Sequence, residues 1–257
     1  MQPMDALNLH TWREPAKRRK VPQEIAYHIR KQILSGSLPR GSKLPSEQIL
    51  TSTLCVSRQT LREGLRILEA QGLLLIKSGQ NGGAFVAEAQ EETACIGLVN
   101  FLHNKQLTVA HLTEVRKVVE PYLVRQAARK ISDADIAALE ALQEKAFQEI
   151  RENDFNRVRA VEISFHGQIA TIAGNPVLSF INAFISHLLV GMKQRLKPSE
   201  AFSLSVAKAH DNILLALKQR DENAAAEAMV QDIEMVMGTL TALAEDQGLL
   251  NWKLIAG

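Results

Sequence analysis

Residues 44–86, LPSEQILTSTLCVSRQTLREGLRILEAQGLLLIKSGQNGGAFV, decide the fold of this chain. The stretch predicts a short helix, a turn, a longer helix and a glycine-rich hairpin, in that order. This is the element order of a winged helix-turn-helix, a fold that places its second helix in the major groove of DNA. We therefore expect a DNA-binding domain at this end of the chain.

The first of these helices has a clear start and end. Ser46 is a favourable N-cap because its side chain can accept a hydrogen bond from a free N–H group of the first turn. Ile49, Leu50 and Leu54 follow at helical spacing and are expected to form its apolar face. Cys55 and the residue after it lead into the turn.

The second helix is expected to run from about Arg58 to Gln71, with Ser57 as its N-cap. Leu61, Leu65 and Leu68 recur at helical spacing and should face the core. Arginine can pair with guanine and glutamine with adenine, while serine and threonine contact bases or phosphates. The polar residues at the N-terminal turn and on the opposite face are Ser57, Arg58, Gln59, Thr60 and Arg62.

The hairpin after this helix is the expected wing. Gly72 ends the helix, residues 73–77 (LLLIK) predict a buried strand, and residues 84–88 (AFVAE) predict the return strand. A helix-turn-helix of this size can also be a simple packing motif, and polar residues on a helix can be only a solvated face. The wing, the cap and the basic face in one register favour DNA binding over that alternative.

These residues strongly resemble the N-terminal domain of GntR-family bacterial transcription regulators, over Val21 to Val86. The matching pieces are IRKQILSGSLPRGSKLPSE, VSRQTLREGLRILEAQGLL and the GG-x-F-V wing. The family usually has arginine directly after the Ser-Glu pair, where this chain has Gln48, so the operator preference is open. The resemblance implies DNA contacts from Gln48, Ser57, Arg58, Gln59, Thr60, Arg62, Ser78 and Gly79.

Composition agrees with two domains of different charge. Residues 1–90 contain 13 Lys or Arg and 7 Asp or Glu, whereas residues 91–257 contain 17 Lys or Arg and 21 Asp or Glu. A basic N-terminal part and an acidic remainder fit DNA binding at one end only. We expect a poorly ordered arm over residues 1–20, a DNA-binding domain over 21–90 and a second domain over 91–250. The KRRK run at residues 17–20 either touches the DNA backbone or is simply solvated.

The cysteine content and hydropathy pattern bear on the compartment. Two cysteines, Cys55 and Cys95, do not make a disulfide framework, which fits a reducing cytoplasm. We find neither a signal peptide nor an apolar run of membrane length in the sequence. The expected location is therefore cytoplasmic, with no membrane partner.

The C-terminal part is expected to be all helical. Apolar residues recur at three- and four-residue spacing in successive segments, with breaks at residues 174–176, 197–198 and 220–221. Ser132 and Asp221 are expected helix starts. The fold class is therefore mostly α, with an antiparallel bundle of six or seven helices following the winged helix-turn-helix.

Four titratable residues stand out in this part. Glu162 and His166 are four residues apart and share one helix face. His210 and Asp232 fall on two later helices. From the residues alone, a surface Glu–His pair and a surface histidine are the commoner interpretation.

The region from about Leu107 to Leu243 resembles the FCD effector-binding domain of the FadR subfamily. The matching pieces are R-x-x-x-E-P from residue 116, E-x-x-x-H from residue 162, AGNPVL, AHDNILLALKQRD and AAAEAM. Many members bind a divalent metal, and the resemblance places its ligands at Glu162, His166, His210 and Asp232. Glu162 replaces the usual Asp and Asp232 replaces the usual His. Two carboxylates and two imidazoles suit Zn²⁺, Mn²⁺, Fe²⁺ or Ni²⁺.

Three alternatives remain at this site. Asp232 either reaches the metal, holds a water or pairs with His210, and His187 is a substitute ligand whose spacing does not match the family. The resemblance directs Arg116 toward the same cavity, where a guanidinium can clamp the carboxylate of a small organic acid. Arg116 paired with Glu120 on its own helix is the competing interpretation.

The expected protein is a transcription regulator, a repressor by the commoner family behaviour, and not an enzyme. Two copies are expected to dimerise on a palindromic operator, with effector binding in the helical domain controlling DNA affinity. A metal-dependent hydrolase with an accessory DNA-binding module is one rival, motivated by the Glu, His and Asp set. An interaction module that no longer binds DNA is the other, and the intact residues 57–62 disfavour it.

Overall fold

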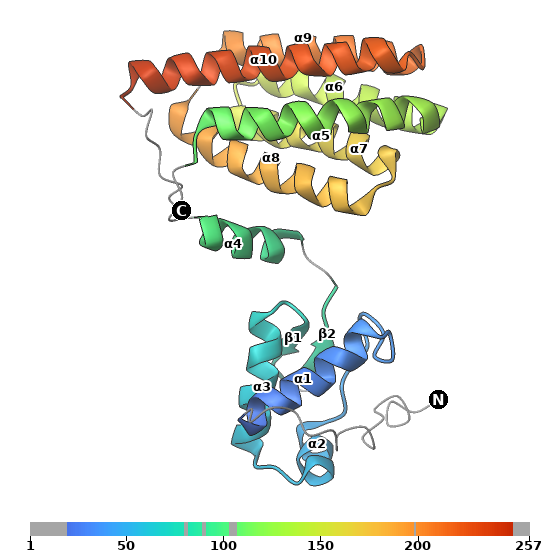
Figure 1. Ribbon diagram of the computed structural model, residues 1–257, viewed down its shortest axis with the longest axis vertical. Coiled ribbons are helices and arrows are strands. Elements are labelled where there is room, and N and C mark those ends of the chain that lie inside the picture. Colours follow the sequence, from blue (N-terminus) through green and yellow to red (C-terminus); the bar gives the residue numbers. More distant parts are fainter. Residues whose placement is uncertain (1–19, 80–81, 89–90, 103–106, 198, 249–257) are drawn as a thin grey trace. The chain divides into compact units, whose positions relative to one another are not determined.

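The computed structural model divides into two compact units, Met1–Ala94 and Cys95–Gly257. It describes residues 20–79, 82–88, 91–102, 107–197 and 199–248 (Figure 1). Of the predicted N-terminal arm only Lys20 is among them, so that prediction lies outside the described residues. Helices dominate both units, as the sequence predicted.

The N-terminal unit has the predicted element order. Ser46 and Ser57 are the N-caps of its second and third helices and accept hydrogen bonds from the N–H groups of Ile49 and Thr60. Cys55 adopts a left-handed conformation, with φ of 51°, and so reverses the chain between the two helices. The elements are α1 (Val21–Leu34), α2 (Glu47–Leu54), α3 (Arg58–Ala70), β1 (Leu74–Lys77) and β2 (Gly83–Val86).

The core of this unit forms where α1 crosses α3. Gly64 of α3 makes the crossing close, because a Cβ there would lie 3.0 Å from both the Pro22 carbonyl oxygen and the Ile25 Cγ2. The three leucines predicted to face the core are all buried. The core side chains are Ile25, Ala26, Ile29, Leu38, Leu44, Leu50, Leu61, Leu65, Leu68, Leu74 and Val86.

The hairpin is less buried than the sequence predicted. β1 pairs with β2 in antiparallel register, from Leu74 opposite Val86 to Lys77 opposite Gly83. Leu74 is buried, but Leu75 and Ile76 are 50% and 38% exposed, so the prediction of a buried strand was wrong. The sheet has two strands, and the helices cover too little of it to enclose every apolar side chain.

The described residues of the C-terminal unit form helices joined by short connections, as predicted. Ser132 and Asp221 are N-caps, as predicted, and α7 ends at Gly174, whose φ is 76°. α10 packs along α5 and α9, and α7 packs against α5, α6 and α8 (Figure 1). Helix α4 (Glu91–Leu102) begins in the N-terminal unit and continues into this one. The other helices are α5 (Val109–Lys130), α6 (Asp133–Arg151), α7 (Phe155–Ala173), α8 (Pro176–Leu196), α9 (Glu200–Lys218) and α10 (Glu222–Asp246).

Helix α8 is long and apolar enough to cross a membrane by length and composition. This corrects the expectation that no stretch reaches membrane length. The core helix of a helical domain can have the same length and composition, and α8 packs against α5 and α7. Its buried face carries Asn182 and Lys193 among the apolar residues.

Candidate functional site

The first turn of α3 presents polar side chains to solvent. Ser57, Arg58 and Gln59 are exposed, and Thr60 is half-buried. The hydroxyl groups of Ser57 and Thr60 lie 2.7 Å apart, which fixes the conformation of the turn. This is the part of a recognition helix that reaches base edges and phosphates.

A basic stripe continues along α3 beyond the predicted contacts. Arg58, Arg62 and Arg66 are all exposed and follow one another at four-residue spacing, which places them on one helix face. Arg66 was not among the predicted DNA contacts, although the spacing of the three arginines would have identified it. The stripe suits a polyanion such as the DNA backbone.

Arg62 also joins the two helices of the helix-turn-helix. Its Nε donates to both carboxylate oxygens of Glu47 on α2, at 2.9 and 3.1 Å. Both side chains are largely exposed, so the pair adds little stability but orients the guanidinium. Gln48, the departure from the family pattern, is exposed beside Glu47.

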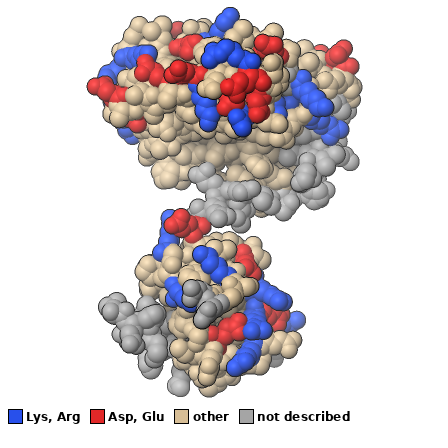
Figure 2. All heavy atoms as spheres, turned by 180° about the vertical axis from the view of Figure 1, so that it is seen from behind, with Lys and Arg blue, Asp and Glu red and all other residues tan. Residues whose placement is uncertain are grey.

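The wing adds a second basic surface. Ser78 and Gly79 are exposed at its tip, as a backbone that approaches phosphates requires. Lys43 and Lys77, which were not predicted, place their ammonium groups 5.4 and 5.0 Å from the centre of the Phe85 ring. Basic side chains predominate on the visible face of this unit, whereas both signs mix over the helical unit (Figure 2).

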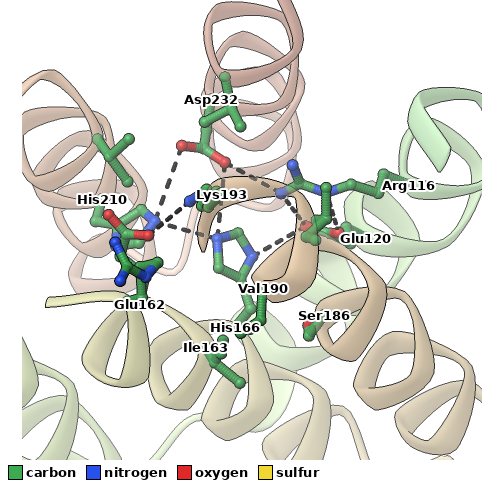
Figure 3. Close-up of a pocket in the computed structure, with 14 residues that line it drawn as sticks. Arg116, Glu120, Glu162, Ile163, His166, Ser186, Val190, Lys193, His210 and Asp232 are labelled. Carbon is green, nitrogen blue, oxygen red and sulfur yellow. Dashed lines mark hydrogen bonds and ion pairs between the residues drawn. The ribbon is translucent and has the colours of Figure 1, made fainter. Parts of the chain in front are cut away.

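Five helices of the C-terminal unit bring titratable side chains to one small cavity (Figure 3). Its volume is about 40 Å³, which is room for a metal ion and a water or two. All the predicted metal ligands line it, and so does the predicted effector residue. The titratable lining residues are Arg116 and Glu120 from α5, Arg159, Glu162 and His166 from α7, Lys193 from α8, His210 from α9 and Asp232 from α10.

Three of these residues are arranged as metal ligands. The Nε2 atoms of His166 and His210 lie 3.1 Å apart, and each lies 3.7 or 3.8 Å from a carboxylate oxygen of Asp232. Ligand atoms about 2 Å from a tetrahedral ion are separated by roughly 3.3 Å, so the set fits an ion such as Zn²⁺. Asp232 Oδ1 is buried and has no hydrogen-bond partner among the described residues, as expected of an atom that awaits a cation.

Neighbouring side chains orient the two imidazoles. His166 Nδ1 lies 2.9 Å from Glu120 Oε2, a hydrogen-bonding distance, although the angle in this structure does not complete the bond. Phe165 stacks on His210, with ring centres 4.4 Å apart and planes within 7°. A carboxylate behind a ligating histidine and fixed ring orientation are the usual surroundings of protein metal sites.

Arg116 lies in the cavity, as the effector-binding interpretation predicts, and is paired with Glu120, as the competing interpretation predicts. Its Nε lies 2.6 Å from Glu120 Oε1 and its Nη2 lies 3.2 Å from Glu120 Oε2. Its Nη2 lies a further 3.4 Å from Asp232 Oδ2. The guanidinium is therefore held between two buried carboxylates at the wall of the cavity.

Burial and charge set the protonation of the group. Burial raises the pKa of the Glu120 carboxyl by itself, but Arg116 and His166 outweigh it and hold that pKa well below its usual range. Burial, reinforced by His166 and Lys193, lowers the pKa of His210 well below its usual value. His210 is therefore neutral at physiological pH, as a metal ligand must be. Burial raises the pKa of Asp232, with His166 and Arg116 opposing the shift.

Glu162 departs from the predicted four-ligand set. Its carboxylate lies outside the group of His166, His210 and Asp232 and instead binds the ammonium of Lys193, at 2.6 Å. The substitute ligand His187 is exposed on α8 and does not line the cavity. Sequence reasoning missed Lys193, although a lysine in register with the buried residues of an apolar helix was a visible signal.

Arg159 of α7 lies in the wall of both this cavity and a hollow at the surface. The hollow is open, has a volume of about 860 Å³ and is formed by the start of α7, the end of α8 and the start of α9. Its Nε is buried and has no hydrogen-bond partner among the described residues.

Fold and sites together define a winged-helix DNA-binding protein with a helical ligand-binding domain. Residues 22–86 match the bacterial regulatory proteins of the gntR family, and residues 111–235 match the FCD domain. The chain therefore belongs to the GntR family of bacterial transcription regulators and carries an FCD domain.

Individual relatives agree with this assignment along most of the chain. The HTH-type transcriptional repressor NanR of Citrobacter rodentium is 27% identical over 237 residues, which are 90% of this chain and 89% of that protein. NanR of Cronobacter sakazakii is 25% identical over 246 residues, 94% and 93% of the two chains. A GntR structure from Streptococcus agalactiae shares the fold, with a TM-score of 0.62 and 23% identity over 84% of this chain and 99% of that one.

Proposed function

We propose that this protein is a repressor that binds a palindromic operator as a homodimer and responds to a small organic acid. The observation that carries the proposal is the exposed arginine stripe of α3 in the same chain as the buried His166, His210 and Asp232 group. Relatives named as transcriptional repressors support the direction of the response. Two recognition helices about 34–36 Å apart would enter successive major grooves.

Direct contacts are assigned to the exposed polar residues of α3 and the wing. Arg58, Gln59 and Arg62 have the donors and acceptors that read base edges. Lys43, Lys77 and Arg66 carry charge suited to phosphates, which fixes register and orientation. The predicted contacts Gln48, Ser57, Thr60, Ser78 and Gly79 remain in the proposed interface.

A divalent ion is assigned to His166, His210 and Asp232, and when bound it would supply a Lewis-acidic site for an anionic group. The charged side chains that line the cavity balance one another in number. They are the cations Arg116, Arg159 and Lys193 and the carboxylates Glu120, Glu162 and Asp232. Glu120 Oε2 lies 2.9 Å from His166 Nδ1, and a hydrogen bond donated by Nδ1 to that carboxylate would leave Nε2 to ligate the ion. A loaded site would therefore carry excess positive charge, which a carboxylate effector balances.

The size of the cavity explains how binding could act at a distance. About 40 Å³ does not enclose an organic acid of several heavy atoms, and we infer that the surrounding helices rearrange when one binds. A ligand shifts such an equilibrium only by its preference for one arrangement. In a repressor that its effector releases from DNA, effector and operator weaken each other's binding by the same factor.

A two-stage experiment tests the proposal. A thermal-shift screen of small carboxylates, with and without ZnCl₂, identifies a ligand that raises the melting temperature. Fluorescence anisotropy with DNA from the promoter region of its own gene then measures operator affinity with and without that ligand. We expect specific binding that the ligand weakens, and operator affinity that is indifferent to a bound ligand would reject effector control.

A further inference from the structure

Glu162 lines the same cavity as the proposed metal ligands, but its carboxylate is bound to Lys193. Glu162 precedes His166 by one helical turn, and both side chains line the same cavity (Figure 3). Its Oε2 accepts a bond of 2.6 Å from Lys193, and the two side chains are only 8% and 11% exposed. Solvent therefore does little to weaken the pair.

Lys193 is held in this position by more than Glu162. It belongs to the buried face of α8, and its ammonium lies 5.4 Å from the centre of the Phe202 ring of α9. Lys193 also lines the same cavity as the proposed ligands His166, His210 and Asp232. A fixed cation thus stands beside the place where a metal ion would bind.

We infer that Lys193 determines how many protein ligands the metal has, because it keeps Glu162 as its own counter-ion and leaves only His166, His210 and Asp232. The inference rests on the metal site of the proposed function. Three protein ligands leave at least one coordination position open, as in sites that exchange a bound group. Lys193 also weakens metal binding, both by withholding one carboxylate and by repelling a second cation.

The inference is tested by replacing each partner of the pair. Lys193→Met keeps the length and apolar stem of the side chain and removes its charge, so Glu162 becomes a buried carboxylate without a cation. Glu162→Gln removes the negative charge and leaves the three proposed ligands in place. The double variant shows whether any effect of the first substitution acts through Glu162.

Zinc affinity of the metal-free proteins is measured by competition with a fluorescent chelator. We expect Lys193→Met to bind Zn²⁺ about 10- to 100-fold more tightly than the wild type, the range over which outer-shell partners change metal affinity. Glu162→Gln should bind no more tightly than the wild type, because it leaves the charge of Lys193 unbalanced. The double variant should bind less tightly than Lys193→Met, because it lacks the Glu162 carboxylate. Unchanged binding by Lys193→Met, or binding by the double variant as tight as that of Lys193→Met, would overturn the inference.

Melting temperatures with EDTA and with ZnCl₂ provide a second readout. Lys193→Met should melt lower than the wild type with EDTA and regain the difference with ZnCl₂. If it does not fold, Lys193→Gln, which still donates a hydrogen bond, takes its place. Zinc binding by the variant but not by the wild type would reject the native metal site and keep the inference. Equal zinc binding by the variant and the wild type would keep the native metal site and reject the inference. No zinc binding by either protein would reject the metal site and the inference together.

Discussion

The Nε2 atoms of His166 and His210 lie 3.1 Å apart, although 44 residues separate them in the sequence. The two imidazoles come from α7 and α9, and Asp232 of α10 completes the triangle. Two nitrogen atoms at this distance suit one hydrogen bond or one shared metal ion. The orphaned Asp232 Oδ1 favours the ion, because a hydrogen bond between the histidines leaves that oxygen without a partner.

Zinc should therefore stabilise the wild type and not a variant that lacks one imidazole. We expect ZnCl₂ to raise the melting temperature of the wild type and to leave that of His210→Gln unchanged. His187→Gln is the matched control, since His187 is exposed on α8 and should keep the full zinc response. An equal zinc response in all three proteins would place the metal elsewhere.

The basic stripe of α3 should carry the specific contacts with DNA. The double variant Arg58→Ala and Arg62→Ala should lose specific operator binding, since each good pairing with a base contributes about 1–3 kcal/mol. Its circular dichroism spectrum should match that of the wild type, because both side chains are exposed. Arg129→Ala, which removes an exposed arginine of the helical unit, should bind the operator normally. Undiminished binding by the double variant would remove these residues from the interface.

The wing should depend on Gly82. A Cβ there would collide with the backbone carbonyl of Lys77, so Gly82→Ala must displace the turn. We expect weaker operator binding with little change in the melting of the helical unit. Gly238→Ala is the control, since a Cβ at that position of α10 meets no atom within 4 Å. Operator binding by Gly82→Ala at wild-type affinity would show that the wing does not contribute.

Arg116 should stabilise the helical unit strongly because it is buried between two carboxylates. Arg116→Met leaves Glu120 and Asp232 buried without their shared cation, and we expect a loss of about 3–5 kcal/mol in the free energy of unfolding. Urea denaturation measures this loss. Lys117→Met removes the neighbouring exposed pair with Glu234 and should cost less than about 1 kcal/mol. Similar losses in both variants would mean that burial of the Arg116 group is not what stabilises it.

Local signals in the sequence predicted the elements well. Ser46, Ser57 and Ser132 cap helices by accepting hydrogen bonds from the N–H groups of residues three positions later. A few consecutive residues are therefore enough to predict this role. The exposure of Leu75 and Ile76 was not predictable in the same way. It depends on how much of the hairpin the helices cover, which is a property of the assembled unit.

At the candidate metal site, too, the sequence predicted the residues but not the contacts that depend on helix packing. Family resemblance pointed to His166, His210 and Asp232, and the fold brings them together. The partner of Glu162 lies 31 residues away on another helix, and only the packing of α7 against α8 pairs them. The sequence therefore proposed a fourth ligand where the structure has an ion pair.

We propose that the buried cavity of the helical unit controls the binding of α3 to DNA. The most direct measurement is operator affinity by fluorescence anisotropy, with and without a saturating carboxylate that the thermal-shift screen identifies. For the wild type we predict at least a roughly tenfold loss of operator affinity, equivalent to about 1.4 kcal/mol of coupling. The same operator affinity with the ligand bound and absent would contradict the account.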